Sequence, residues 1–415
     1  MIVITYTMNI SRNWNFTRFL IAKTMMRVVF LLFTTFVLWE IYVQTKSVFY
    51  DGLIPTFSLL GYLAILAPGG IILDKFRRSR VFFIISILLL ATYSVLLFSR
   101  TLIFLYAITF AGSMFSAYTG DILGTIMKDT VPEEELGKTN SHLSFTRGIS
   151  DVIGFASGGL SILIGFNFFF AIIILFSAVS ILFSMPISAE TKKGKMQPGK
   201  GRIGKFLIRI LPLLLLGLAL NGLFISIDVF AAGLVDKVLN GTSTQYTLLL
   251  VGQPIGLLIG SAASVKYNVK LSSTFSMIAG IAILGLFTFI LGFNRNPDLL
   301  IFITLPMGIF EATVNVAIGT MFLKIIPSDL LGRIGAVSGL FFLGSTPLMA
   351  FIWSVLASFI YFPLIIQYAG IAVIILGIAS ALPVKKIVDG LKSESLSAST
   401  QQDPQTGKGV HDQTP

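Results

Sequence analysis

The stretch Val131–Lys138 (VPEEELGK) reappears in altered form 195 residues later, as Ile326–Arg333 (IPSDLLGR). Just upstream of the first copy stands the pair Gly124–Thr125, which recurs at the same offset as Gly319–Thr320. The chain on both sides of each copy is strongly apolar. A hydrophobic chain built from two similar halves is typical of a secondary transporter that has its substrate site between the halves.

The composition of the 415 residues indicates a protein surrounded by lipid. Hydrophobic residues make up 55% of the chain and charged residues 12%, and the mean hydropathy is +0.89. Charged residues make up about 25% of an ordinary soluble domain, so the surface of this chain would aggregate in water. The chain contains no cysteine, which excludes a disulfide framework and a cysteine metal site.

Twelve segments are apolar enough to cross a bilayer as helices, which takes about 20 residues each. They fall into two sets of six, which predicts an all-α integral membrane protein with two pseudo-symmetric six-helix halves. The first segment is too long for the core of a signal peptide, so it is interpreted as a true span. The predicted spans are 19–43, 52–73, 81–99, 102–127, 143–165, 168–188, 206–235, 246–265, 274–293, 299–323, 334–358 and 364–384.

The positive charges predict which loops face the cytoplasm, because lysine and arginine concentrate there. With the N-terminus inside, the inside segments carry 23 of the 30 lysines and arginines, and the outside loops carry only 4. Both termini are therefore expected in the cytoplasm of a cell whose plasma membrane holds the protein. The same bias accounts for the net charge of +11 without a nucleic-acid partner.

The polarity of the chain also predicts its division into parts. Residues 1–188 form an N-terminal half and 206–384 a C-terminal half. Residues 189–205 are polar and contain glycines and a proline, so they are interpreted as a cytoplasmic linker. Residues 385–415 are rich in serine, glutamine and threonine, and they are expected to form a disordered cytoplasmic tail.

The loop after the second span reads GIILDKFRRS over residues 70–79, and its key residues are Gly70, Asp74, Lys75 and Arg78. It resembles the pattern Gly-x-x-x-Asp-Arg/Lys-x-Gly-Arg-Arg/Lys of the major facilitator superfamily, although Arg77 replaces the second glycine and Ser79 the last cation. The resemblance covers about residues 15–385. It implies a twelve-helix transporter in which this loop helps to latch the cytoplasmic gate.

A narrower resemblance concerns Asn15-Phe16 and the stretch 132–140, which are similar to the macrolide-efflux and siderophore-exporter branch of drug–proton antiporters. The fifth span contains GFASGG over residues 154–159, which resembles the antiporter motif Gly-Pro-x-x-Gly-Gly with Phe155 in place of the proline. In the family, helices 5 and 8 meet between the halves. The glycines expected to pack there are Gly154, Gly158, Gly159, Gly256 and Gly260. Simple small-residue packing explains the same glycines without a transport role.

Charged residues inside spans mark the candidate substrate or proton site. A charge in the middle of a bilayer costs at least about 2.5 kcal/mol, so one that persists has a partner or a task. The resemblance implies that helices 1, 4, 7 and 10 line the central cavity. Helical spacing places two asparagines on the same faces as two of the acids. The candidate proton-coupling and cavity residues are Arg27, Asp121, Asn221, Asp228, Glu311 and Asn315.

Two ion pairs are expected near the cytoplasmic ends of the helices. Arg27 and Asp121 are predicted to lie at a similar depth, so they could form a functional or a purely structural bridge. Arg147 and Asp151 are four residues apart in the fifth span, where an intrahelical ion pair is the simplest interpretation.

Four acids differ in how easily they can be explained. Glu311 is expected in the middle of its span with no nearby cation on its own helix, which favours a functional role. Asp228 is expected nearer the outside, where hydration could account for it. Glu40 and Asp51 flank the first outside loop and are expected to lie in water.

The missing motifs narrow the function. Without a Walker phosphate loop and with only two histidines, neither ATP, a metal nor any other cofactor is expected, and the chain is not expected to be an enzyme. We expect a monomeric transporter that works by alternating access, with lipid, protons and a small-molecule substrate as its partners. The favoured activity is export of a small amphipathic or cationic compound in exchange for protons. The alternative is a proton symporter that imports a nutrient such as a sugar or organic acid.

Overall fold

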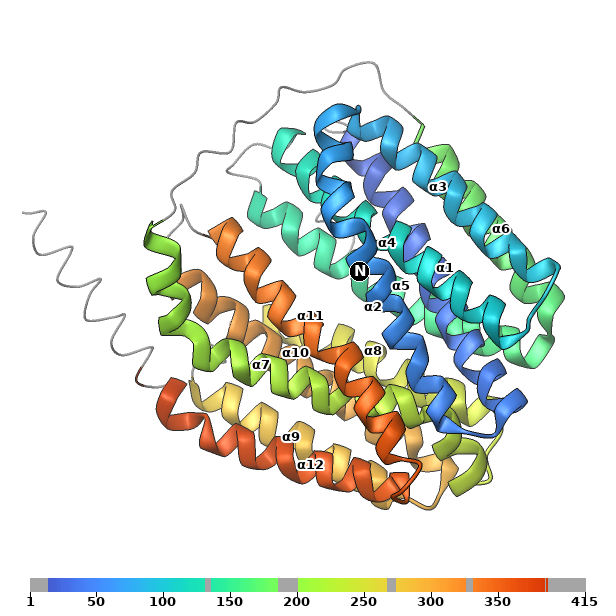
Figure 1. Ribbon diagram of the computed structural model, residues 1–415. Coiled ribbons are helices and arrows are strands. Elements are labelled where there is room, and N and C mark those ends of the chain that lie inside the picture. Colours follow the sequence, from blue (N-terminus) through green and yellow to red (C-terminus); the bar gives the residue numbers. More distant parts are fainter. Residues whose placement is uncertain are drawn as a thin grey trace, which may run out of the picture.

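The computed structural model describes residues 14–130, 136–185, 201–266, 274–325, 331–384 and 386. Within these ranges the chain forms twelve α-helices (Figure 1). The first six are α1 (Trp14–Thr45), α2 (Val48–Lys75), α3 (Arg78–Ser94), α4 (Leu102–Thr130), α5 (Leu136–Ile164) and α6 (Phe166–Phe183). The other six are α7 (Gly201–Gly233), α8 (Ser243–Lys266), α9 (Thr274–Phe293), α10 (Leu300–Ile325), α11 (Leu331–Leu356) and α12 (Phe362–Ala379).

The twelve helices correspond in order to the twelve predicted spans, and the fold class is confirmed. Several helices extend beyond their apolar segment, because a helix satisfies its own backbone hydrogen bonds in water as well as in lipid. The largest extensions are at the starts of α1, α5 and α7, and α7 begins inside the predicted linker. Residues 189–200 of that linker and nearly all of the predicted tail lie outside the described residues.

Ten helices in the described part of the chain are long and apolar enough to span a membrane. The apolar stretches described in α4 and α11 are shorter, at 102–116 and 344–356. Large apolar side chains are exposed on the helix surfaces, among them Phe104, Leu175, Phe275, Phe302 and Ile375. Such exposure would be unfavourable in water and is natural against lipid.

The two halves repeat the same helix partnerships. In the N-terminal half α1 packs against α5, α2 against α4 and α3 against α6; in the C-terminal half α7 packs against α11, α8 against α10 and α9 against α12. The pairs α3–α6 and α9–α12 lie at opposite edges of the bundle (Figure 1). The sequence repeat is therefore a repeat of structure, with each helix matched by the one six positions later.

One close helix contact shows the repeat at the offset found in the sequence. A Cβ atom at Gly61 of α2 would collide with the carbonyl oxygen of Phe110 on α4. A Cβ atom at Gly256 of α8 would collide with the carbonyl oxygen of Leu305 on α10. Gly256 lies 195 residues after Gly61, and Leu305 lies 195 residues after Phe110. Only glycine lets the two backbones approach this closely.

Each half has its own aromatic and aliphatic core. In the N-terminal half Phe36 of α1 stacks on Phe169 of α6, with ring centroids 4.0 Å apart. In the C-terminal half Phe230 of α7 packs against Phe362 of α12 at 5.4 Å. The long helices that cross these cores position the polar residues that lie between and beside them.

The halves meet through two matched contacts near the α1–α2 and α7–α8 connections, which is the predicted outer end of the bundle. Gly159 of α5 lies against Thr247 of α8, and Gly52 of α2 lies against Ser354 of α11. At the 195-residue offset Thr247 is the counterpart of Gly52, and Ser354 is the counterpart of Gly159. The glycine belongs to the N-terminal half in both contacts. The interface is thus pseudo-symmetric down to single residues.

Candidate functional site

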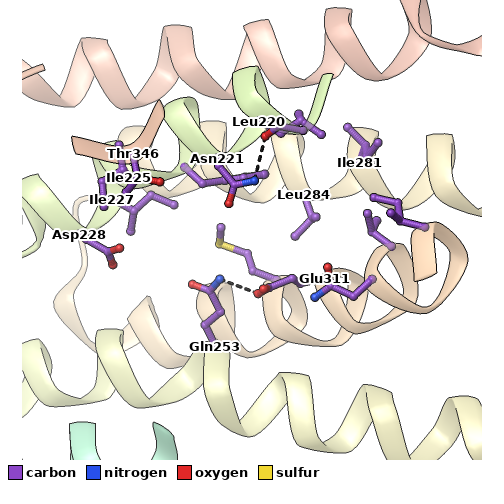
Figure 2. Close-up of a pocket in the computed structure, with 16 residues that line it drawn as sticks. Leu220, Asn221, Ile225, Ile227, Asp228, Gln253, Ile281, Leu284, Glu311 and Thr346 are labelled. Atoms are coloured by element: carbon purple, nitrogen blue, oxygen red, sulfur yellow. Dashed lines mark hydrogen bonds between the residues drawn. The ribbon is translucent and has the colours of Figure 1, made fainter. Parts of the chain in front are cut away.

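A cavity of about 290 Å³ lies within the C-terminal half, bounded mainly by α7, α9 and α10. Its apolar lining includes Leu220, Phe224, Leu284 and Met307. Its polar lining residues are Asn221, Asp228, Gln253, Glu311, Asn315 and Thr346. Of these, Asp228, Gln253 and Glu311 direct their side chains toward the same space (Figure 2).

Helical spacing explains why one face of α10 reaches the cavity. Its lining residues Met307, Glu311, Asn315 and Ile318 recur every three or four positions, as residues on one face of a helix do. On α7 the same spacing brings Gly217, Asn221, Phe224 and Asp228 to the cavity. The predicted pairs of an acid with an asparagine therefore line one space, contributed by two helices.

Glu311 receives a hydrogen bond from a residue that the sequence analysis did not single out. The side-chain amide of Gln253 on α8 donates to Oε2 of Glu311, with an N–O distance of 2.7 Å (Figure 2). A glutamine within an apolar span is itself an unusual polar residue, and the proline that follows, Pro254, adds a helix breaker. This combination in the sequence could have identified Gln253 as a candidate site residue. Gln253 fixes the direction in which the carboxylate of Glu311 points.

A second cavity of about 170 Å³ connects this site to the N-terminal half. Asp151 and Phe155 of α5 line it from one side, and Asp228, Gln253 and Glu311 line it from the other. Three carboxylates from both halves thus face a common region. Among the described residues that line either cavity there is no lysine or arginine.

Asp151 is the ion-pair partner of Arg27, for which the sequence analysis expected Asp121. The guanidinium of Arg27 on α1 donates from Nε to Oδ1 and from Nη2 to Oδ2 of Asp151, the second at 2.9 Å. The expected intrahelical pair of Arg147 with Asp151 is wrong, because α1 packs on α5 and brings Arg27 to the same carboxylate. Asp121 lies on α4, and its side chain is outside the described residues.

Lys23, the other basic residue of the first span, also points to a neighbouring helix. Its ammonium donates to the carbonyl oxygen of Ser116 at 2.9 Å and to Oγ1 of Thr119 at 2.6 Å, both on α4. Hydrogen bonds of this kind reduce the cost of holding a charge among apolar side chains. Lys23 therefore joins α1 to α4, while Arg27 joins α1 to α5.

Most of the glycines expected between the halves pack within a half instead. Gly154 and Gly158 of α5 lie against α1, at Leu31 and Thr35. Gly256 and Gly260 of α8 lie against α10. Only Gly159, among these five, has its nearest neighbour in the other half. The helices α5 and α8 do meet, yet a helix has several faces, and small residues on α5 and α8 serve more than one of them.

Two further predictions are treated differently by the structure. Asp51 was expected in water, and this is wrong: the residue is fully buried, because α11 covers the start of α2. The loop between α2 and α3 falls at the predicted position, but the side chains of its predicted gate residues lie outside the described ones. The gate role of Gly70, Asp74, Lys75 and Arg78 stays a prediction.

The arrangement is suited to binding. Over the ranges that the structure describes, no group of three histidine, cysteine or acidic side chains could hold a metal ion. The site offers a set of carboxylates and amides beside apolar side chains in a partly open cavity, where Asn221, Asp228 and Asn315 are exposed. Such groups can hold protons, cations or hydrogen-bond donors.

Known structures share this fold. A bacterial homologue of the human lysosomal transporter Spinster, in an inward-facing and unoccupied conformation, has a TM-score of 0.68 at 13% identity, over 92% of this chain and 98% of that one. A D-xylose–proton symporter has a TM-score of 0.68 at 13% identity, over 88% and 96%. A transporter of the POT family in complex with a thioalcohol-conjugated peptide has a TM-score of 0.70 at 12% identity, over 90% and 96%. At these identities the likeness shows the fold alone.

A comparison with curated protein sequences gave no match. A family model described as the Major Facilitator Superfamily matches residues 19–232. The family points to a membrane transporter of small molecules. Since the family match spans more than half of the sequence, the chain belongs to the Major Facilitator Superfamily.

Proposed function

We propose that this transporter exports a small amphipathic or cationic compound in exchange for protons. The observation that supports the proposal is the pair of carboxylates, Asp228 and Glu311, in the wall of one cavity without a lining cation among the described residues. Two ionised carboxylates that face one cavity repel each other. A bound proton or a cationic substrate removes that cost.

Competition for these acids would couple the two fluxes. When the site is protonated, a cationic substrate has lost its counter-charge and leaves. When the proton leaves, the carboxylate attracts a new substrate molecule. Gln253 donates to Glu311 and holds the carboxylate toward the cavity, where either ligand can reach it.

The position of the second cavity lets both halves respond to the ligand. It is lined by α5 of the N-terminal half and by α7, α8 and α10 of the C-terminal half. A ligand there contacts both sides of the interface on which the halves move in alternating access. Coupling follows if proton and substrate favour different orientations of the halves.

The test is transport by purified protein in proteoliposomes with and without an imposed pH gradient, using a panel of cationic and neutral dyes. Wild-type protein should accumulate a cationic dye against its gradient when protons flow the other way. Glu311→Gln should abolish this accumulation, because an amide cannot release a proton. Asp228→Asn should give a similar but smaller loss. Asp298→Asn is the matched control, because Asp298 is an exposed acid outside both cavities.

Two outcomes would contradict the proposal. Dye that moves in the same direction as the protons would show symport, the alternative that one of the structural neighbours performs. Full gradient-driven accumulation by Glu311→Gln would remove Glu311 from the coupling step. Asp121 and Asp151 would then be the acids to test next.

A further inference from the structure

Asp51 is a fully buried acid. It lies in the first turn of α2, and its exposed fraction is 0%. Within the described part of the chain, neither oxygen of its carboxyl group, Oδ1 or Oδ2, has a hydrogen-bond partner. The next residue, Gly52, lies against Ser354 of α11, so Asp51 is enclosed where the two halves meet.

Three contacts join the two halves at residues 46–52, and we call them the outer seal after their predicted side of the membrane. Lys46 pairs with Asp236 across the halves, with a distance of 3.2 Å between Nζ and Oδ2. Val48 lies against Gly233 at the end of α7. The outer seal consists of Lys46, Val48, Gly52, Gly233, Asp236 and Ser354.

The titratable groups nearest to Asp51 do not neutralise it. Tyr42 of α1, Tyr106 of α4 and Tyr246 of α8 interact with it electrostatically. Tyr106 donates its hydroxyl to the carbonyl oxygen of Tyr50 at 3.0 Å, and Tyr246 donates to that of Thr35 at 3.3 Å.

The charged groups of the outer seal also leave Asp51 without a counterion. Lys46 is engaged by Asp236 on the π-helical turn that follows α7. Among the described residues, no cation pairs with Asp51. An isolated buried carboxylate costs several kcal/mol even after relaxation, whereas the neutral acid costs far less. The closed seal is therefore compatible with a protonated Asp51.

The internal repeat shows that this position does not require an acid. The residue 195 positions after Asp51 is Tyr246, at the matching contact between α8 and α5. Tyr246 is fully buried too, but its hydroxyl group has a partner and its ring packs against Trp39 at 4.9 Å. One copy of the contact is thus satisfied, and the other contains an unpartnered ionisable group.

We infer that Asp51 is a second proton-binding site, which holds a proton while the outer seal is closed and releases it to water when the seal opens. Opening separates α2 from α11 and hydrates the carboxyl, which can then ionise. High proton concentration on that side therefore favours the closed state. The inference does not depend on Glu311 or on the direction of substrate transport.

The experiment measures the opening of the outer end as a function of pH. Spin labels at Thr101→Cys and Ser358→Cys would report the distance between the α3–α4 and α11–α12 connections, since both residues are exposed and the chain has no native cysteine. Double electron–electron resonance is recorded from acidic to alkaline pH. The closed population should fall as pH rises, by about tenfold in the equilibrium constant per pH unit, as linkage to one proton requires.

In Asp51→Asn, which mimics the neutral acid, the short distance should persist to alkaline pH. Asp298→Asn, at an exposed acid outside the outer seal and both cavities, is the control and should keep the transition. Asp51→Ala replaces Asp51→Asn if the latter does not fold. An unchanged transition in the Asp51 variants, or a wild-type distance that does not respond to pH, would refute the inference.

Infrared spectroscopy gives an independent readout on the wild-type protein. A protonated buried carboxyl has a C=O stretching band that an ionised one lacks. At neutral pH this band should appear in the difference between the spectra of the wild-type protein and Asp51→Asn. Identical spectra in that region would overturn the assignment of a proton to Asp51.

Discussion

At the scale of single residues, the pair of Arg27 with Asp151 holds two charges in an apolar region. The side chains are 36% and 15% exposed. Arg27→Gln leaves the carboxylate of Asp151 without its partner, so we expect the free energy of unfolding to fall by about 1–3 kcal/mol. The double variant Arg27→Gln/Asp151→Asn removes both charges and should recover part of that loss. Thermal unfolding in detergent, arranged as a double-mutant cycle, measures the coupling.

The exposed pair of Lys46 with Asp236 is the matched control for that cycle. Its side chains are 61% and 34% exposed, so the coupling energy should be only about 0–1 kcal/mol. If the two cycles give equal coupling energies, the Arg27–Asp151 pair stabilises the fold no more than an exposed ion pair does.

The same residues show what sequence reasoning could and could not reach. Counting residues along the helices gives the depth of a residue, and it led to Asp121 as the expected partner of Arg27, whereas the structure pairs Arg27 with Asp151. The partner depends on which helix packs against which face, and one sequence does not contain that information. Asp51 illustrates the same gap, because its burial comes from α11, about 300 residues away in the chain.

At the scale of elements, the close approach of α2 to α4 and of α8 to α10 depends on two glycines. A methyl group at Gly61 or Gly256 would meet a backbone carbonyl, which cannot rotate away. Gly61→Ala and Gly256→Ala should each lower the free energy of unfolding by about 1–3 kcal/mol through overpacking. Gly344→Ala in α11 is the control, because nothing lies within 4 Å of the added carbon.

The control variant should be neutral or more stable by about 0.5–1 kcal/mol, as alanine is a better helix former than glycine. Melting temperatures of the three purified variants decide the matter. Equal stability of all three would mean that the α2–α4 and α8–α10 contacts yield without cost.

Helices were the best-predicted elements, since a lipid-exposed span must satisfy every backbone group within itself. That requirement makes a long apolar run sufficient to predict a helix such as α9, for which the predicted range 274–293 and the observed one agree. Helix ends such as the start of α7 depend instead on polar residues beyond the lipid. The faces of α5 and α8 depend on packing, which is why four of the five glycines contact helices of their own half.

At the scale of the whole molecule, the repeat explains both the architecture and its limits as a guide. The 195-residue offset links Gly61 with Gly256 and Gly159 with Ser354, so the two halves and their interface follow from one duplicated pattern. The two acids proposed to function in coupling break the pattern: the counterparts of Glu311 and Asp228 are Ser116 and Phe33. The cavity with two carboxylates is consequently a property of one half, which the symmetry alone does not predict.

Orientation in the membrane is a property of the whole chain, and the bias of 23 against 4 positive charges predicts it. Because the chain lacks cysteine, single cysteines can be labelled without background. In intact cells an impermeant maleimide should not label Gly199→Cys or Ser393→Cys, which lie in the predicted linker and tail. It should label Ser358→Cys, an exposed residue at the α11–α12 connection.

Permeabilised cells should allow labelling at all three positions, which shows that the unlabelled cysteines are accessible from the other side. Labelling of Gly199→Cys in intact cells, together with protection of Ser358→Cys, would reverse the orientation. The outer seal and Asp51 would then face the cytoplasm. The cell, and not the medium, would set the proton concentration at Asp51. The side of the membrane therefore decides which proton pool controls the seal, and the labelling pattern has to be known before its pH dependence is assigned a physiological direction.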